Sequence, residues 1–171
     1  MRKIFLDIGA YDGNDSKWFL ENNPEGKVFA FECDKRNVEA IKKRGLDIRL
    51  IEAAAWIYDG EVEYYYGNPD GGTLLSCKKT GGINPFNYYS VPCIDFAKFM
   101  KDNFIKADHI TIKMNCEGSE YQLINHIKRT NLIEWVDKWY VDWHYHKIGM
   151  KESEHNDIAK LIKNNRWPLW K

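Results

Sequence analysis

FLDIGAYDGNDS, residues 5–16, joins the end of an apolar run to a polar turn that contains two glycines. The apolar run covers Lys3–Ile8 and stops at Gly9, which is typical of a short buried strand. The residues after the turn, Ser16–Asn22, carry aromatic and aliphatic side chains at helical spacing and predict a helix. The stretch therefore predicts a strand, a tight turn and a helix in direct succession.

The same alternation continues beyond this unit. Residues 27–32 form a second apolar run, residues 34–44 have a helical pattern that Gly45 ends, and residues 47–52 form a third apolar run. Strands and helices that alternate within about fifty residues favour a parallel sheet with right-handed crossovers. We therefore expect an α/β fold, with one domain over residues 1–171 and a mostly parallel, doubly wound sheet.

The second half of the sequence has a different rhythm. Residues 54–58 and 61–66 flank Asp59-Gly60, a dipeptide that supplies the positive φ angles of a tight turn, so we expect an inserted β-hairpin. Residues 67–90, with Tyr88 and Tyr89, are rich in Gly, Asn and Pro and indicate a lid or binding loop, or else a merely exposed loop. The remaining expected elements are a helix at 95–102, a strand at 109–114, a helix at 119–127, a strand at 139–143 and a helix at 152–164.

Composition excludes several classes of protein. Lys plus Arg and Asp plus Glu each number 25, so the net charge is zero and no electrostatic footprint for nucleic acid is present. Asp7 interrupts the N-terminal apolar run too early for a signal peptide, and no stretch approaches a membrane span, so we expect a cytoplasmic protein without a membrane or nucleic-acid partner. The cysteines form no CxxC pair and match no zinc pattern, which favours free, reduced thiols at Cys33, Cys77, Cys93 and Cys116.

The turn after the first strand lacks the spacing of a dinucleotide site. A nicotinamide site requires GxGxxG around a pyrophosphate, whereas Tyr11 occupies the position of the middle glycine here. A ligand without a pyrophosphate is therefore expected, and S-adenosylmethionine is such a ligand. We expect Gly9, Ala10 and Gly13 to contact its methionine moiety through their backbone, with Asp7 near the ammonium group. The alternative is an ordinary tight turn between a strand and a helix.

Glu32 ends the second strand, 23 residues after Gly9. An acid at this place can accept hydrogen bonds from both hydroxyls of a ribose, a group that S-adenosylmethionine and NAD share. The alternative for Glu32 is a solvated acid at a helix N-terminus. Cys33, Ala53 and Ala54 follow the second and third strands, and we expect them to line the adenine or else to pack in the core.

ITIKMNCEGSE, residues 110–120, contains the end of the fourth strand, a polar cluster and the start of a helix. In a doubly wound sheet the fourth strand lies beside the first, across the switch point where ligands bind. The cluster is therefore expected to face the reacting methyl group. Asn115 and Glu117 are candidate catalytic residues, and Asn115 is also a candidate cofactor contact. Glu117 can take a proton from a hydroxyl group or simply stabilise the helix N-terminus.

VDWHYH, residues 141–146, combines an acid with two histidines. On a strand, Asp142, His144 and His146 share one face. An acid beside a histidine is typical of a base and its orienting group, so Asp142 and His144 are candidate catalytic residues, and His146 is interpreted as structural. The alternative for His144 is a hydrogen-bonded core histidine. No metal is expected, and a metal held by Asp142, His144 and Glu117 is a weaker alternative because nothing fixes its geometry.

Six segments resemble, in this order, the FkbM family of methyltransferases. They cover nearly the whole chain and read FLDIGAYDGNDS (5–16), VFAFECDKRN (28–37), AAWIYDGEVEYYYG (54–67), IDF (94–96), ITIKMNCEGSEYQLI (110–124) and VDWHYH (141–146). The resemblance implies a Rossmann-like class I methyltransferase fold with S-adenosylmethionine as cofactor. It also implies O-methylation of a small hydroxylated acceptor such as a sugar.

Three features depart from the family pattern. Asn115 stands where the family has an aspartate, and an amide cannot act as a general base. Asp142-x-His144 replaces the family's Glu-x-His. The chain ends soon after its last expected helix, at residues 166–171, so the strand hairpin that usually ends the sheet is cut short, and Pro168 suits only an edge strand.

Three hypotheses follow. The leading one is an S-adenosylmethionine-dependent O-methyltransferase with a small-molecule acceptor. Asn115 and the short C-terminal end motivate a second hypothesis, a non-catalytic module that binds S-adenosylmethionine. The third is a nicotinamide-dependent enzyme, against which Tyr11 argues.

Overall fold

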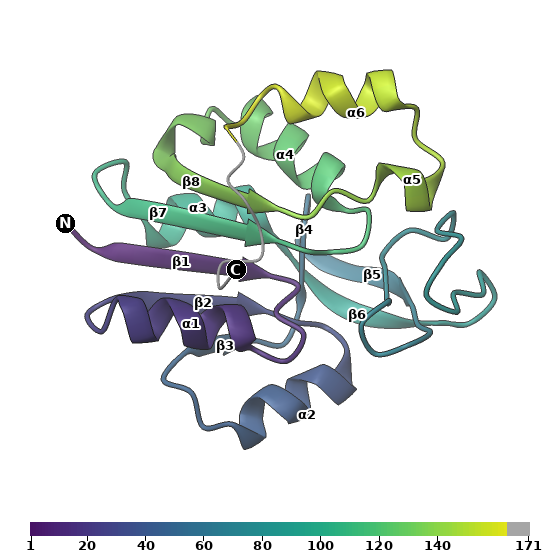
Figure 1. Cartoon of the computed structure of the whole chain (residues 1–171), viewed down its shortest axis with the longest axis horizontal. Coiled ribbons are helices and arrows are strands. Elements are labelled where there is room, and N and C mark those ends of the chain that lie inside the picture. Colours follow the sequence, from purple (N-terminus) through teal and green to yellow (C-terminus); the bar gives the residue numbers. More distant parts are fainter. Residues whose placement is uncertain (164–171) are drawn as a thin grey trace.

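The computed structural model describes residues 1–163, and a five-stranded sheet in the order β3-β2-β1-β7-β8 lies at its centre (Figure 1). Every neighbouring pair in this sheet is parallel. β1 pairs with β2 on one side and with β7 on the other, so the predicted switch point is present. The strands are β1 (Lys3–Ile8), β2 (Lys27–Phe31), β3 (Arg49–Ile51), β7 (His109–Met114) and β8 (Val136–Val141).

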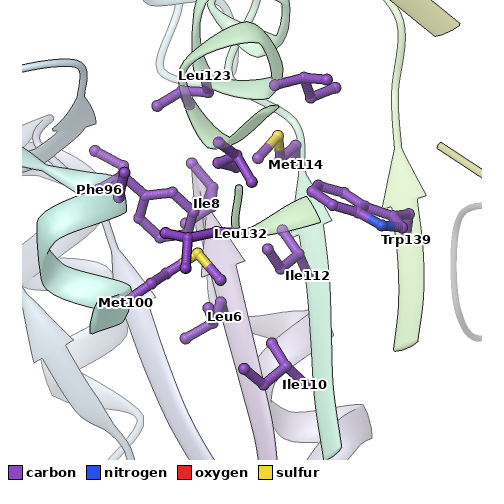
Figure 2. Close-up of a cluster of buried hydrophobic side chains, with 14 of the residues drawn as sticks. Leu6, Ile8, Phe96, Met100, Ile110, Ile112, Met114, Leu123, Leu132 and Trp139 are labelled. Carbon is purple, nitrogen blue, oxygen red and sulfur yellow. The ribbon is translucent and has the colours of Figure 1, made fainter. Parts of the chain in front are cut away.

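Helices cover both faces of this sheet. They are α1 (Asn14–Asn22), α2 (Lys35–Lys43), α3 (Phe96–Asn103), α4 (Glu120–Arg129) and α6 (Glu152–Ala159), with the 3-10 helix η1 (Ile133–Trp135) before β8. Successive residues of β1 point to opposite faces. Phe5 points toward α1, where its ring stacks on Phe19 with centroids 4.7 Å apart. Leu6 points to the other face and joins Phe96 of α3 and Leu123 of α4 (Figure 2). The predicted α/β fold with a doubly wound, mostly parallel sheet is confirmed.

A second sheet of three strands takes the place of the expected β-hairpin, so that prediction is wrong. Its strands are β4 (Ala54–Trp56), β5 (Gly60–Tyr65) and β6 (Tyr88–Asp95), in the order β4-β6-β5. β6 pairs in parallel with β4 and antiparallel with β5, and thus separates them. The reason is packing. With the strands in the order β4-β6-β5, Trp56 of β4, Val91 of β6 and Tyr64 of β5 belong to one buried cluster. The expected loop also ends earlier than predicted, where β6 begins.

The chain leaves the sheet after β8, and this overturns the prediction of a strand face for residues 142–146. β8 ends at Val141, and His144 is the N-cap residue of the short helix α5 (Tyr145–Ile148). Asp142, His144 and His146 therefore share no strand face. The alternation that suggested one falls in a turn and a helical segment, where a period of two has no meaning.

Other helix boundaries follow from local capping. α2 begins after Asp34, whose carboxylate accepts the Arg36 N–H at 2.9 Å, and α3 begins after Asp95 in the same manner. α6 ends at Ala159, before the predicted end at residue 164. The segment 166–171, with the predicted edge-strand residue Pro168, lies outside the described residues. Within residues 1–163, no helix combines the length and the apolar character needed to cross a bilayer.

Candidate functional site

A cavity opens at the carboxyl ends of β1, β2 and β7, where the strand order reverses. The space within it, including its open mouth, is about 700 Å³. The predicted site residues in its lining are Gly9, Glu32, Cys33, Ala53, Ala54, Asn115 and Glu117. The predicted site residues outside its lining are Asp7, Ala10, Gly13, Asp142 and His144.

Gly9 is required where two backbones approach closely. Its φ is +72°, and a Cβ atom there would lie 2.1 Å from the carbonyl oxygen of Asn115. The Asn115 N–H donates to the Ile8 carbonyl at 3.0 Å, and the Gly9 N–H donates to the Phe31 carbonyl at 3.1 Å. The absence of a side chain at Gly9 therefore lets the ends of β1, β2 and β7 form one wall of the cavity.

Of the other residues of this turn, Tyr11 faces the cavity, whereas Ala10 and Gly13 face the core. Tyr11 lines the cavity in a left-handed conformation, with φ of +52°. Ala10 is buried in the core cluster that contains Phe5, and Gly13 lies beside Ile41 of α2. Ala10 and Gly13 thus shape the turn from behind, and their contact with a cofactor stays a prediction.

Glu32 fastens this turn to the end of β2 and also lines the cavity. One carboxylate oxygen accepts the Tyr11 N–H at 2.8 Å, and the other accepts the N–H groups of Cys33 and Asp34 at 2.9 and 2.8 Å. Burial raises the pKa of Glu32 to about 7, although these donors act in the opposite direction. A carboxylate has about four acceptor positions, so Glu32 keeps capacity for a further donor.

Residues 67–78, here named the strap, form the outer wall of the cavity. The Asn37 side-chain amide donates to the Pro69 carbonyl at 2.9 Å, which ties the strap to α2. The Thr73 hydroxyl donates to the Glu117 carbonyl at 2.9 Å, which ties it to the turn between β7 and α4. The sequence predicted residues 67–90 to be a lid or binding loop, or else a merely exposed loop. The strap contributes to the lining Pro69, Asp70, Gly72, Thr73 and Leu74.

Glu117 combines backbone strain with a dense set of charges. Its φ is +55°, a conformation that costs a non-glycine residue on the order of 1–3 kcal/mol and that clusters at functional sites. Its carboxylate lies 2.6 Å from Nζ of Lys78, 3.0 Å from Nζ of Lys147 and 3.4 Å from Nε2 of His144. Burial raises the pKa of Glu117, but these cations outweigh burial and lower it. Glu117 is therefore ionised at neutral pH.

His144 is held between acids behind Glu117. Its Nδ1 lies 2.9 Å from Oε1 of Glu120, and its Nε2 lies 3.4 Å from Oδ2 of Asp142. Burial lowers the pKa of His144, but the hydrogen bonds to Asp142 and Glu120 dominate and raise it to about 9. At neutral pH His144 is an imidazolium, which has no lone pair to accept a proton. This arrangement argues against His144 as a base and gives Asp142 the role of orienting a cation.

Asn115 has an unsatisfied acceptor at the cavity. The residue is part of the lining, and within the described chain its Oδ1 is buried without a hydrogen-bond partner. Buried acceptors in folded proteins are nearly always paired, so this oxygen indicates a donor from a ligand or a water molecule.

Asp7 is held by the protein itself. It is fully buried, accepts the Ser16 hydroxyl at 2.6 Å and lies 2.9 Å from Nζ of Lys113. Lys113 also donates to the Gly9 carbonyl at 2.7 Å. Lys113 was not among the predicted site residues, although a lysine inside the apolar run 110–114 was an available signal, because a buried ammonium requires acidic partners.

The cavity contains neutral thiols. Cys33 and Cys116 line it as free cysteines, and burial raises the pKa of both well above the ordinary value, so they are unreactive at neutral pH. Cys77 and Cys93 are also unpaired. Among residues 1–163, no group of three or more His, Cys, Asp or Glu side chains is placed to hold a metal ion.

Comparisons with known proteins place the chain in a family. The sequence profile of the methyltransferase FkbM domain matches residues 7–166. The 2-O-methyltransferase NoeI of Sinorhizobium fredii is 35% identical over 71 residues, a stretch that spans 40% of this chain and only 29% of that protein. No solved structure matches the chain. The Rossmann-like chain described above belongs to the FkbM family of methyltransferases.

Proposed function

We propose that the chain is an S-adenosylmethionine-dependent O-methyltransferase acting on a small hydroxylated acceptor such as a sugar. Family membership supports methyl transfer, and the similarity to a 2-O-methyltransferase supports an oxygen acceptor. One observation carries the proposal: Gly9, Glu32 and Asn115 line a single cavity at the switch point of the sheet.

The lining residues fit this cofactor. Glu32 has acceptor capacity for one ribose hydroxyl, and Cys33, Ala53 and Ala54 offer a small, uncharged surface for the adenine. The unpaired Oδ1 of Asn115 can accept a hydrogen bond from the ligand. When bound, S-adenosylmethionine supplies a methyl group that is activated by its positive sulfonium. Asp7, Ala10 and Gly13 lie outside the cavity lining, so they would support the glycine turn from behind and would not line the cavity themselves.

Glu117 is the residue we assign to the acceptor hydroxyl. Methyl transfer is an in-line displacement at carbon, and alignment of the two reactants supplies much of the acceleration. The ionised Glu117 accepts the hydrogen bond of the hydroxyl and so orients its oxygen. Because the pKa of Glu117 is lowered, it is a weak base, and it takes the proton only as the new bond forms. The cationic side chains of His144 and Lys147 favour the ionised form of Glu117. Asp142 holds His144 in place.

Isothermal titration of the protein with S-adenosylmethionine and with its demethylated product tests the proposal. We expect binding of both, and Glu32→Ala should weaken both by about tenfold or more, because the variant leaves a donor of the ribose unpaired. Glu39→Ala, which changes an exposed acid of α2, is the matched control and should leave binding unchanged. No binding by the wild-type protein would refute the proposal. Mass spectrometry after incubation with a panel of sugars and polyols then identifies the acceptor.

A non-catalytic binding module is a second candidate, because Asn115 replaces the aspartate of the family. It predicts cofactor binding without a methylated product across the whole panel. In that case Asn115→Asp should create turnover, provided that the loss of the acid is what silenced the site. A methylated product from the wild-type protein would exclude this candidate.

A further inference from the structure

The turn that lines the cavity at Gly9 and Tyr11 leads into α1, whose N-terminus carries acids in the place where dinucleotide-binding folds hold a pyrophosphate. Asp12 precedes the helix and accepts the Asn14 N–H at 3.0 Å, and Asp15 lies in the first turn. A helix N-terminus has a partial positive charge that attracts anions. Here the carboxylates of Asp12 and Asp15 oppose that charge, so the start of α1 is unsuited to an anionic ligand.

Asp15 belongs to a buried cluster with more negative than positive charge. Nζ of Lys113 lies 2.9 Å from Asp7 and 3.3 Å from Asp15, so two carboxylates face one ammonium. Ser16 adds only a neutral hydroxyl. Asp15 is 5% exposed, and within the described residues its Oδ1 has no hydrogen-bond partner. The cluster therefore lacks one positive charge.

The cluster touches the wall of the cavity. Lys113 donates to the carbonyl of Gly9 at 2.7 Å, and Gly9 is part of the lining. The unbalanced charge thus lies directly behind the glycine turn, in a buried environment where Coulomb interactions are stronger than in water.

We infer that the Asp7–Lys113–Asp15 cluster selects the positively charged S-adenosylmethionine over its neutral demethylated product, with Asp15 as the positioning residue. This inference rests on the proposed function, since it concerns the same cavity. A net negative charge attracts a sulfonium and has little effect on a thioether. The ribose, adenine, ammonium and carboxylate are common to both ligands, so their contributions cancel when the two affinities are divided. The protein would therefore bind the demethylated product more weakly than S-adenosylmethionine.

Isothermal titration with both ligands tests the inference in the wild-type protein and in Asp15→Asn. We expect the variant to lower the ratio of the two affinities by about 3- to 20-fold in favour of the product, which is the Coulomb effect of removing one charge if its separation from the sulfonium is on the order of 10 Å. Sinefungin, which has an amine in place of the sulfonium, should lose affinity together with S-adenosylmethionine. Asp12→Asn removes a more solvent-accessible charge of the same turn and is the matched control, with a change of less than about twofold.

A measurement on the unmodified protein is independent of how well the variant folds. Burial raises the pKa of Asp15 to about 6, with Lys113 opposing and Asp7 and Asp12 adding to the shift. The affinity ratio should therefore fall as the pH is lowered from 8 to 5, because protonation removes the same charge. A constant ratio over this range, or an unchanged ratio in folded Asp15→Asn, would overturn the inference and leave the proposed function intact. Failure of both ligands to bind the wild-type protein would instead refute the proposed function.

Discussion

The carboxylate of Glu117 lies 2.6 Å from Nζ of Lys78, and this ion pair joins the strap to the turn between β7 and α4. The Lys78 side chain is completely buried and also donates to the Gly71 carbonyl within the strap. One side chain thus holds the outer wall of the cavity closed and keeps a candidate catalytic carboxylate ionised.

Lys78→Met should loosen the strap. We expect the free energy of unfolding to fall by about 1–3 kcal/mol, because a buried donor is lost while Lys147 still partly compensates Glu117. The bound cofactor should also dissociate faster. Urea titration and stopped-flow displacement measure the two effects. Lys79→Met changes the adjacent, exposed lysine and should do neither; equal effects of the two substitutions would show that the buried ion pair does not hold the strap.

Gly9→Ala should destabilise the protein by about 3 kcal/mol or more, because the new Cβ would lie 2.1 Å from the Asn115 carbonyl. Gly45→Ala is the control that measures backbone strain without a steric clash. Gly45 also has a positive φ, +60°, but a Cβ atom there would have no other atom within 4 Å. Its substitution should cost only about 1–2 kcal/mol, the strain of the left-handed conformation. Similar costs in urea unfolding would contradict the close approach of the two turns.

Cofactor affinity should increase between pH 6 and pH 8. The pKa of Glu32 is about 7, and in the proposed complex a ribose hydroxyl donates to the ionised form, so cofactor binding would favour loss of the proton. The free energy of unfolding should change in the opposite direction and decrease as the pH rises. The folded-state pKa of Glu32 exceeds the ordinary value of 4.5, so the contribution of Glu32 to stability is full below pH 4.5 and is lost as the pH rises through 7. Titration calorimetry and urea unfolding should show both trends, and Glu32→Gln should flatten both. Parallel trends in wild type and variant would point to another titrating group.

Alkaline pH should remove a contribution of His144 to stability. Its folded-state pKa of about 9 exceeds the ordinary 6.5, so the contribution is full below pH 6.5 and is lost as the pH rises through 9. We expect a loss of about 1–3 kcal/mol between these limits, and a smaller loss in His144→Gln. His146→Gln, at an exposed position, is the control. An NMR titration of the His144 imidazole measures the pKa directly, and a midpoint at or below 6.5 would refute the imidazolium and restore the candidate base.

The central sheet could be predicted because its signals are local. Lys3–Ile8 and residues 110–114 are apolar runs that end in polar turns, and parallel strands bring such ends to one edge. This edge is also why Gly9, Glu32 and Asn115 could be assigned to one site from their positions alone.

The remainder depends on contacts between distant segments. β6 contains Pro92 and follows a loop rich in Gly and Asn, so its place between β4 and β5 is set by tertiary packing. The contact of Lys78 with Glu117 arises only when the irregular strap docks. The charge of His144 depends on Glu120, a residue of α4 that no pattern around His144 reveals.

Tyr65 and Tyr88 are cross-strand partners, so residues 66–87 begin and end at neighbouring positions of the second sheet, and Thr73 within them forms a further bridge with Tyr65. The pairing of Tyr65 with Tyr88 holds the two ends of this segment side by side, and the closure entropy of a loop with fixed ends changes only slowly with its length. The register between β5 and β6 therefore does not depend on the length of the segment that joins Tyr65 to Tyr88. Replacing the whole segment would remove the strap as well, and with it the Lys78–Glu117 ion pair and the Pro69 and Thr73 contacts that join the outer wall of the cavity to its two sides.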